Sequence, residues 1–391
     1  MNVQHAPQGP VARQRDPEPS FAATTWRTRV ATWSEKVAGS VFIWPAVLVL
    51  LSLSIFPLFL SLYMSFARFQ FVKGGFVLRF VGLANYRKLL VGSQKQHFLG
   101  VWASPHPVWW IIAGGITLFF LYSWFRLLRS ERPSTGRIFW QFIATLVVGI
   151  LLWTVMHTIT PGGRPGTFQV TLTYVGIGLT AQYLLGLGLA MLCSQPLPGR
   201  RFFRVVFLLP MMITPVGVAY LFRMLTDTNQ GPFQPLWYAL GLANFSWVND
   251  PWGARAAVII GDVWEWTPFM FIVLLAALES IPTDLVEASL VDGANRWQIF
   301  RYITWPHIRS VSATLILIRM IEAFKIVDLP NVLTNGGPGT ASESMTLQAY
   351  IYWRSLDLGG SAAVAYLLLL TVTFVGLAYF NLVHRPATEG S

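Results

Sequence analysis

The sequence has few charged residues and almost no cysteine. Asp, Glu, Lys and Arg make up 12% of its 391 residues, whereas hydrophobic residues make up 54%. A soluble domain of this size needs a more polar surface, so the composition predicts a polytopic membrane protein. The single cysteine, Cys193, lies in an apolar run, which excludes a disulfide framework and a cysteine-rich metal site.

Familiar signatures of nucleotide and metal chemistry are also missing. No stretch reads Gly-x-x-x-x-Gly-Lys-Ser/Thr, the loop that cradles nucleotide phosphates, and neither His-Glu-x-x-His nor Gly-x-Ser-x-Gly occurs. The six histidines show no spacing typical of metal ligands; they are His5, His97, His106, His157, His307 and His384. We therefore expect no metal site, and a membrane-embedded enzyme, one rival interpretation, lacks a catalytic constellation.

Basic residues outnumber acidic ones by 28 to 17, which gives a formal net charge of +11. They are dispersed among apolar runs and form no patch, so we expect no nucleic-acid partner. Membrane orientation explains them better, because the cytoplasmic loops of membrane proteins are rich in Lys and Arg.

Eight stretches are apolar and long enough to cross a membrane, which takes about 20 residues. They are residues 41–66, 107–126, 138–159, 168–193, 203–225, 256–280, 308–330 and 361–383. If the N-terminus is cytoplasmic, every later segment on the cytoplasmic side is basic, and the outside segment 226–254 has no Lys or Arg. The outside segment 67–106 is basic and is the one exception to this orientation. The sequence predicts an all-α polytopic protein of about eight spans, with both termini cytoplasmic and lipid around it.

A polar segment broken by a glycine lies between the sixth and seventh predicted spans. Asp284 can act as an N-cap with Glu287 at position N3, so we expect a helix from about 285 to 292. Gly293 suits the left-handed turn that ends a helix, and a second helical stretch is expected over residues 295–304. The pattern favours a compact protrusion on which a soluble partner docks, and an ordinary loop with a capped helix is the alternative.

Charged residues also fall inside the predicted span 308–330, where they are costly and usually paired or functional. Arg319 and Glu322 are three residues apart, as are Lys325 and Asp328, so each pair can form an ion pair along one helix. Substrate contact through Glu322 and Lys325 and structural pairing across the bundle both stay open. These charges are also the best argument for a second rival, a secondary transporter driven by an ion gradient.

Acidic and indole side chains lie together in the sixth predicted span, at Asp262, Trp264, Glu265 and Trp266. Carboxylates accept hydrogen bonds from sugar hydroxyls, and indole faces pack against the apolar faces of sugar rings. Pro268 would free backbone groups and bend the helix, as happens near transporter sites. The four residues are candidates for a substrate path, and a kinked helix near the interfacial aromatic belt is the alternative.

The glycine-broken segment resembles the EAA loop of binding-protein-dependent ABC importers, whose pattern is Glu-Ala-Ala, three residues, Gly, nine residues, Ile-x-Leu-Pro. The matching residues are Glu287, Ala288, Gly293, Ile303 and Pro306, while Ser289 replaces the second alanine and Trp305 the leucine. By this resemblance, the residues expected to couple the chain to a separate ATPase are Glu287, Ala288, Ser289, Asp292, Gly293 and Arg296.

Four further motifs resemble carbohydrate-uptake permeases of the maltose and glycerol-phosphate type: Phe80–Tyr86, Phe207–Pro210, Asp262–Phe269 and Asn335–Gly339. Such permeases commonly have six spans, so the resemblance implies a type I importer core with an inserted helix pair. The expected divisions are a cytoplasmic tail (1–40), the first span and outer loop (41–97), the inserted pair (98–167), the permease core (168–383) with its coupling loop (281–307), and a cytoplasmic C-terminal tail (384–391).

The resemblance also implies a function. The chain would be a permease subunit that imports a sugar or polyol across the bacterial cytoplasmic (inner) membrane, after delivery by an extracytoplasmic binding protein. It would pair with a second homologous permease and sit on two ATPase subunits, which hydrolyse ATP with Mg²⁺ and couple through residues 284–306. The chain itself would bind no cofactor and would not be an enzyme.

Overall fold

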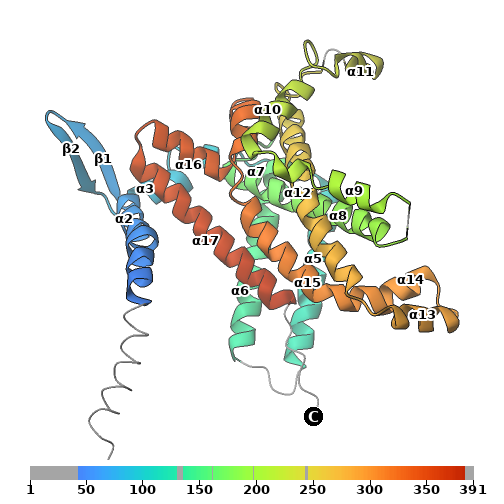
Figure 1. Ribbon diagram of the computed structural model, residues 1–391. Coiled ribbons are helices and arrows are strands. Elements are labelled where there is room, and N and C mark those ends of the chain that lie inside the picture. The colour runs from blue at the N-terminus through green and yellow to red at the C-terminus, as the bar shows by residue number, and fades with distance from the viewer. Residues whose placement is uncertain (1–42, 130–134, 161, 197, 243–244, 384–391) are drawn as a thin grey trace, which may run out of the picture. The chain divides into compact units, whose positions relative to one another are not determined.

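The computed structural model describes residues 43–129, 135–160, 162–196, 198–242 and 245–383 (Figure 1). The chain divides into two compact units, residues 1–61 and 62–391. In the first unit the described part is helical: a π-helical turn, η1 (Leu51–Ile55), leads into α2 (Phe56–Ser65). The helix from Ile43 to Ser65 is long and apolar enough to cross a membrane. The predicted tails 1–40 and 384–391 lie outside the described residues.

The second unit begins with the last turn of α2, which is followed by an antiparallel hairpin in this otherwise helical chain. Strand β1 (Ala67–Val72) pairs with β2 (Gly75–Phe80), with Ala67 opposite Phe80. Two short helices follow, α3 (Ala84–Leu90) and α4 (Lys95–Leu99). The buried Asn85 amide ties them to the end of α2 by donating to the carbonyls of Ser65 and Ala67, at 2.8 and 3.0 Å. These strands lie between the predicted spans, where hydropathy carries no signal for them.

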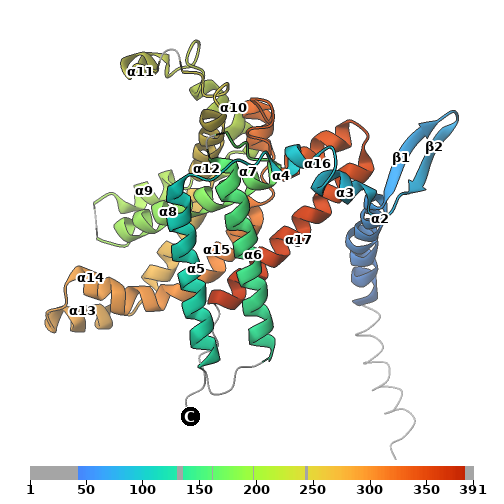
Figure 2. The same ribbon diagram turned by 180° about the vertical axis from the view of Figure 1, so that it is seen from behind.

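Two long helices then form a hairpin, α5 (Pro107–Leu128) and α6 (Thr135–Ile159), which run side by side in both views (Figure 2). Polar side chains join them. Gln141 Nε2 donates to Ser123 Oγ at 2.8 Å, and Trp124 Nε1 donates to Thr145 Oγ1 at 3.1 Å. In an apolar environment such bonds hold a helix pair together. These helices cover the two spans that the sequence places in the inserted segment.

The two ends of the inserted segment meet. Val101 and Arg164 exchange both backbone hydrogen bonds, at 2.8 and 3.0 Å. Next to this bridge, Gly100 and Gly166 approach backbone to backbone: a Cβ on Gly100 would lie 2.3 Å from the Arg164 carbonyl oxygen, and a Cβ on Gly166 would lie 2.4 Å from the Phe98 carbonyl oxygen. Only glycine permits this approach at both positions.

The remaining elements form a helical core in chain order. They are α7 (Thr167–Thr173), η2 (Tyr174–Gly178), α8 (Leu179–Cys193), α9 (Arg200–Val206), η3 (Pro210–Met212), α10 (Pro215–Leu225), α11 (Gln234–Ala239), α12 (Pro251–Glu279), α13 (Thr283–Val291), α14 (Arg296–Ile299), η4 (Phe300–Thr304), α15 (Trp305–Ala323), η5 (Pro330–Thr334), α16 (Met345–Arg354) and α17 (Leu358–Val383).

The pair α8 and α12 forms the centre of this core. Gly186 on α8 faces α12 so closely that a Cβ would lie 2.5 Å from the Cβ of Met270 and 3.0 Å from the backbone nitrogen of Phe271. Met270 and Phe271 are fully buried in the same cluster. A small residue at such a contact lets two membrane helices pack backbone against backbone.

Two of the eight predicted spans are wrong as single straight helices. Over residues 203–225 the segments Arg200–Met212 and Pro215–Leu225 meet at 97°, because Pro210 and Pro215 interrupt the helical hydrogen bonds. Over residues 308–330 helix α15 already ends at Ala323.

The predicted number of eight spans is not confirmed. Among the described residues, five helices are long and apolar enough to cross a membrane, or six if the bent pair counts as one span. Helix α6 is not one of the five, although it has 25 residues; the side chains of several of its residues are not described.

Candidate functional site

The glycine-broken segment folds as helix, turn and helix. Helix α13 begins at Thr283, directly after Pro282, which has φ −57°. The predicted N-cap is therefore wrong: Asp284 lies inside the helix, and Glu287 forms no capping box with it. Pro282 has ψ 129°, outside the helical region, so it occupies the N-cap position and Thr283 is the first helical residue.

The turn itself is as predicted. Gly293 has φ +80°, its N–H donates to the Leu290 carbonyl at 3.1 Å, and the Ala294 N–H donates to the Ser289 carbonyl at 2.9 Å. This pair of bonds is the Schellman motif, which ends a helix with glycine in the left-handed conformation. A Cβ at Gly293 would meet nothing within 4 Å, so the backbone conformation alone selects glycine here.

A second capped helix follows at once. Asn295 and Gln298 form a capping box, in which the Asn295 side chain accepts the Gln298 N–H at 2.9 Å and the Gln298 side chain accepts the Asn295 N–H at 2.7 Å. Helix α14 continues through η4 into α15, with Pro306 in the first turn of α15. The segment is therefore rigid from α13 to α15.

This rigid segment is also exposed. Figure 1 shows α13 and α14 at the far ends of α12 and α15. Five of the six predicted coupling residues are exposed: Glu287, Ala288, Asp292, Gly293 and Arg296. Ser289 is half-buried, and its hydroxyl donates to the Val286 carbonyl. Apolar side chains beside them are exposed as well, Val291 by 88% and Trp297 by 69%. Exposed apolar side chains on a capped helix pair suit contact with a partner protein.

A second group of predicted residues lies in the helical core and joins three helices. Arg319 on α15 donates from Nη2 to both carboxylate oxygens of Asp262 on α12, at 2.8 Å each, and from Nε to Gln182 on α8 at 2.9 Å. Gln182 Nε2 donates to Asp262 Oδ2 at 2.7 Å. The guanidinium also lies over the Trp266 ring, 4.6 Å from its centroid. Arg319 is 1% exposed, so the charge is buried and fully paired.

The predicted pairing along α15 is wrong. Arg319 turns to Asp262, because a buried guanidinium is stable only beside a carboxylate that shares its environment. Glu322 pairs with Lys325 instead, at 2.7 Å, and both side chains are about half-exposed. Substrate contact by Glu322 and Lys325 stays a prediction.

Among the acidic and indole residues of α12, Glu265 differs from its neighbours. Asp262 and Trp266 both hold Arg319, and the Trp264 ring packs edge-on against Phe222 at 5.7 Å. Glu265 is 3% exposed, and its buried Oε2 has no hydrogen-bond partner among the residues that the structure describes. A buried carboxylate oxygen with a free lone pair can accept a ligand hydroxyl, which makes Glu265 the best placed of the substrate-path candidates.

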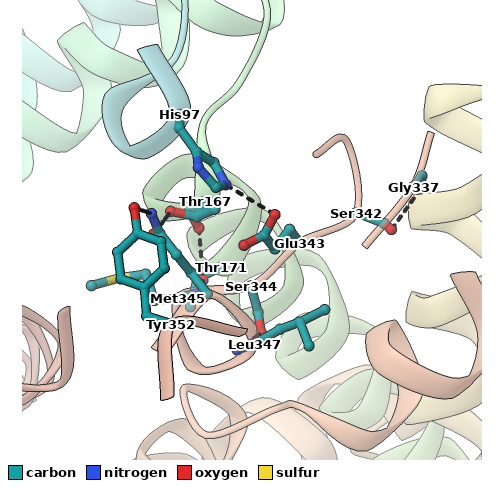
Figure 3. Close-up of polar contacts among 11 residues, drawn as sticks. His97, Thr167, Thr171, Gly337, Ser342, Glu343, Ser344, Met345, Leu347 and Tyr352 are labelled. Atoms are coloured by element: carbon teal, nitrogen blue, oxygen red, sulfur yellow. Dashed lines mark hydrogen bonds and ion pairs between the residues drawn. The ribbon is translucent and has the colours of Figure 1, made fainter. Parts of the chain in front are cut away.

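Sequence reasoning missed a third polar cluster, shown in Figure 3. The Nε2 atom of His97, from α4, lies 2.9 Å from Oε2 of the buried Glu343. The other carboxylate oxygen of Glu343, Oε1, has no partner among the described residues. The Thr167 hydroxyl donates to Gln348 at 2.7 Å, and the Thr171 hydroxyl accepts the Met345 N–H at 2.9 Å.

These contacts order the loop that carries the Asn335–Gly339 motif. The Ser342 hydroxyl donates to the Gly337 carbonyl at 2.7 Å, and Ser344 caps α16 by accepting the Leu347 N–H at 3.1 Å. Glu343 lies four residues after Gly339 of this motif, but its partner, His97, lies 246 residues away in the sequence, so spacing carried no signal for the pair. In the part of the chain that the structure describes, no three His, Cys, Asp or Glu side chains gather as a metal site.

One family match contains both the segment α13–α14, called the coupling segment below, and the buried residues Gln182, Asp262 and Arg319 that join α8, α12 and α15. Residues 182–387 match the family described as binding-protein-dependent transport system inner membrane component. The chain belongs to this family. The match begins at Gln182 itself and leaves the α5–α6 hairpin outside. As an inner membrane transport component, the chain is a permease and not an enzyme, and the family supports this interpretation over an ion-driven carrier.

Curated members of the family are similar over about half of the chain. The trehalose/maltose transport system permease protein MalF of Thermococcus litoralis is 34% identical over 215 residues, which cover 55% of this chain and 71% of that protein. The sulfoquinovosyl glycerol transport system permease protein SmoG of Agrobacterium fabrum is 31% identical, over 51% of this chain and 65% of that protein. The trehalose permease SugA of Mycobacterium tuberculosis is 28% identical, over 56% and 70%.

A solved permease has the same fold. A chain of the bacterial ABC transporter that imports the acidic polysaccharide alginate aligns with a TM-score of 0.52 and 20% identity, over 72% of this chain and 96% of that chain. At this identity the likeness concerns the fold alone.

Proposed function

We propose that this chain is the permease subunit of an ABC importer for a sugar or sugar-like solute. The observation that carries the proposal is the exposed, doubly capped segment α13–α14, which stands between two core helices and matches the EAA pattern. The sugar class is supported by relatives named for trehalose, maltose and sulfoquinovosyl glycerol.

The proposal includes the partners and the orientation. Two ATPase subunits bind and hydrolyse ATP with Mg²⁺, a second homologous permease completes the pathway, and an extracytoplasmic binding protein delivers the solute. The chain lies in the bacterial cytoplasmic membrane with both termini in the cytoplasm. The inserted pair (98–167) and the permease core (168–383) are separate divisions of the chain, and the chain binds no cofactor itself.

The geometry supports a lever mechanism. A displacement of α13 would be transmitted to α12 through a three-residue link, residues 280–282. It would also be transmitted to α15, because α14 and η4 continue into that helix without a break. The Asp262–Arg319–Gln182 bridge then joins α12, α15 and α8, so the three helices move together. Rocking of such a rigid group exposes a central site alternately to the two sides of the membrane. Glu265 lies one turn from this bridge and would face the solute.

The experiment is purification of the tagged chain from its native membrane in mild detergent, with mass spectrometry of the accompanying proteins. We expect an ATPase and a second permease with the wild-type chain and with Gly293→Asn, because asparagine tolerates the left-handed conformation. Gly293→Val should lose the ATPase, since a β-branched residue there is strained by about 1–3 kcal/mol.

Gly241→Val is the matched control. Gly241 also has a positive φ, of 73°, with open space around it, but lies outside the coupling segment. It should keep the ATPase. A wild-type chain that purifies alone in every detergent, or a Gly293→Val chain that keeps its ATPase, would contradict the proposal.

A further inference from the structure

A cavity of about 840 Å³ lies beside the start of α12, about two helical turns before Asp262. Three segments line it: residues 158–165 after α6, of which residue 161 is not described, residues 249–255 at the start of α12, and residues 338–341 before α16. Its volume falls in the range of small-molecule sites. In the proposed orientation it opens on the outer side, where solute arrives.

Arg255 makes this cavity chemically unusual. The residue is 4% exposed and lines the cavity; its Nε donates to the Ala341 carbonyl at 2.6 Å, and its guanidinium lies 4.8 Å from the centre of the Trp252 ring. No carboxylate of the described residues lies within ion-pair distance of it. The nearby Asp250 carboxylate is engaged in capping α12, accepting the Gly253 N–H at 2.6 Å.

Comparison with Arg319 shows that Arg255 lacks an acidic partner among the described residues. Both arginines are buried in the same helical core, but Arg319 Nη2 donates to both oxygens of the Asp262 carboxylate, whereas no hydrogen bond joins a terminal nitrogen of Arg255 to a described residue. A buried charge is costly unless an opposite charge joins it. An anion that enters the cavity would give Arg255 the opposite charge that Asp262 gives Arg319.

The rest of the lining suits a sugar acid. A second arginine, the exposed Arg164, also lines the cavity, and its guanidinium forms no ion pair with any described residue. Guanidinium groups bind carboxylate oxygens in a two-pronged geometry. Trp252, which is 48% exposed, offers an aromatic face against which the C–H groups of a sugar ring can pack.

We infer that this cavity binds a small sugar acid, with its carboxylate between Arg255 and Arg164 and its ring against Trp252. The inference rests on the proposed importer function and narrows its substrate class to anionic sugars. It also gives the inserted segment a role, because Arg164 lies at the end of that segment and supplies one of the two positive charges.

The test is direct binding of radiolabelled D-glucuronate to the full-length chain in lipid nanodiscs, with D-glucose and inorganic sulfate as comparison ligands. We expect saturable glucuronate binding, at least about tenfold tighter than that of glucose or sulfate, and a loss of affinity of about 10- to 100-fold in Arg255→Gln and in Arg164→Gln. Arg223→Gln is the matched control: this exposed arginine donates to the Val332 carbonyl away from the cavity and should bind glucuronate as the wild type does.

Equal binding of glucuronate and glucose, sulfate binding as tight as glucuronate binding, or unchanged affinity in Arg164→Gln would overturn the inference. Arg164 is exposed, so its variant decides the question even if Arg255→Gln fails to fold. Binding in nanodiscs needs no ATPase. A chain that co-purifies with its ATPase but does not bind glucuronate would leave the proposed function standing and remove only the sugar-acid site.

Discussion

Breaking the bridge between Asp262 and Arg319 tests whether the three core helices are held together by charge. In Asp262→Asn the Arg319 guanidinium stays buried without a carboxylate partner. In Arg319→Met the Asp262 carboxylate stays buried without a guanidinium partner. Each change should lower the free energy of unfolding by about 3–5 kcal/mol, because an uncompensated buried charge remains. The double variant removes both charges together and should be far less destabilised than the sum of the two.

The coupling energy of this double-mutant cycle should therefore exceed the cost of either single variant, which is about 3–5 kcal/mol. The assay is equilibrium unfolding of the purified chain in mixed micelles, titrated with SDS and followed by circular dichroism. The pair Glu322, in the last turn of α15, and Lys325, in the turn directly after it, is the control. Their side chains are 44% and 56% exposed and three residues apart, so their cycle should give only about 0.2–0.5 kcal/mol.

The reasoning fails if the two cycles give similar coupling energies. It also fails if either single variant at the buried bridge is no less stable than the double variant. In that case water or lipid headgroups would satisfy the buried charges, and the bridge could not act as the mechanical link between α12 and α15.

Two further predictions concern α8 and α12. Gly186→Ala should lower the melting temperature, because overpacking against Met270 costs about 1–3 kcal/mol of stability. Gly188→Ala, where a Cβ meets nothing within 4 Å, should melt at or above the wild-type temperature, because alanine favours a helix over glycine. Thermal unfolding with size-exclusion detection compares them, and equal melting of the two variants would refute the close packing. Glu265→Gln should raise the KM of sugar uptake by about tenfold, because the amide replaces one acceptor oxygen by a nitrogen and the loss of one hydrogen bond costs about 1–1.5 kcal/mol. Transport kinetics in proteoliposomes measure it, and an unchanged KM would make Glu265 a structural residue.

Hydropathy predicted the long core helices well because their signal is local. The spans at 168–193, 256–280 and 361–383 correspond to Thr167–Cys193, Pro251–Glu279 and Leu358–Asn381. The break at 97° within residues 203–225 was missed because a hydropathy window averages over it, although Pro210 and Pro215 mark it in the sequence.

In the coupling segment, too, one locally determined feature was predicted correctly and another was not. The turn at Gly293 was predictable, since a left-handed helix end depends on one residue and its immediate neighbours. The start of α13 was placed too late because Asp284 has the chemistry of an N-cap, while Pro282 determines where the helix begins.

The buried bridge could not be predicted from spacing. Residues three apart on one helix suggested that Arg319 pairs with Glu322, but its partners lie 57 and 137 residues away, at Asp262 and Gln182. Which distant side chain meets Arg319 is decided by how α8, α12 and α15 pack. The sequence pointed to the right residues and left their partners undetermined.

The bridge between Val101 and Arg164 has a consequence for how such a permease can vary. Because the chain leaves and re-enters the core at two paired residues, with glycine at positions 100 and 166 to allow the contact, a short turn could join residues 101 and 164 in place of the α5–α6 hairpin. Loss of the hairpin would then leave the backbone of the core continuous, but it would uncover the part of α17 against which α6 packs.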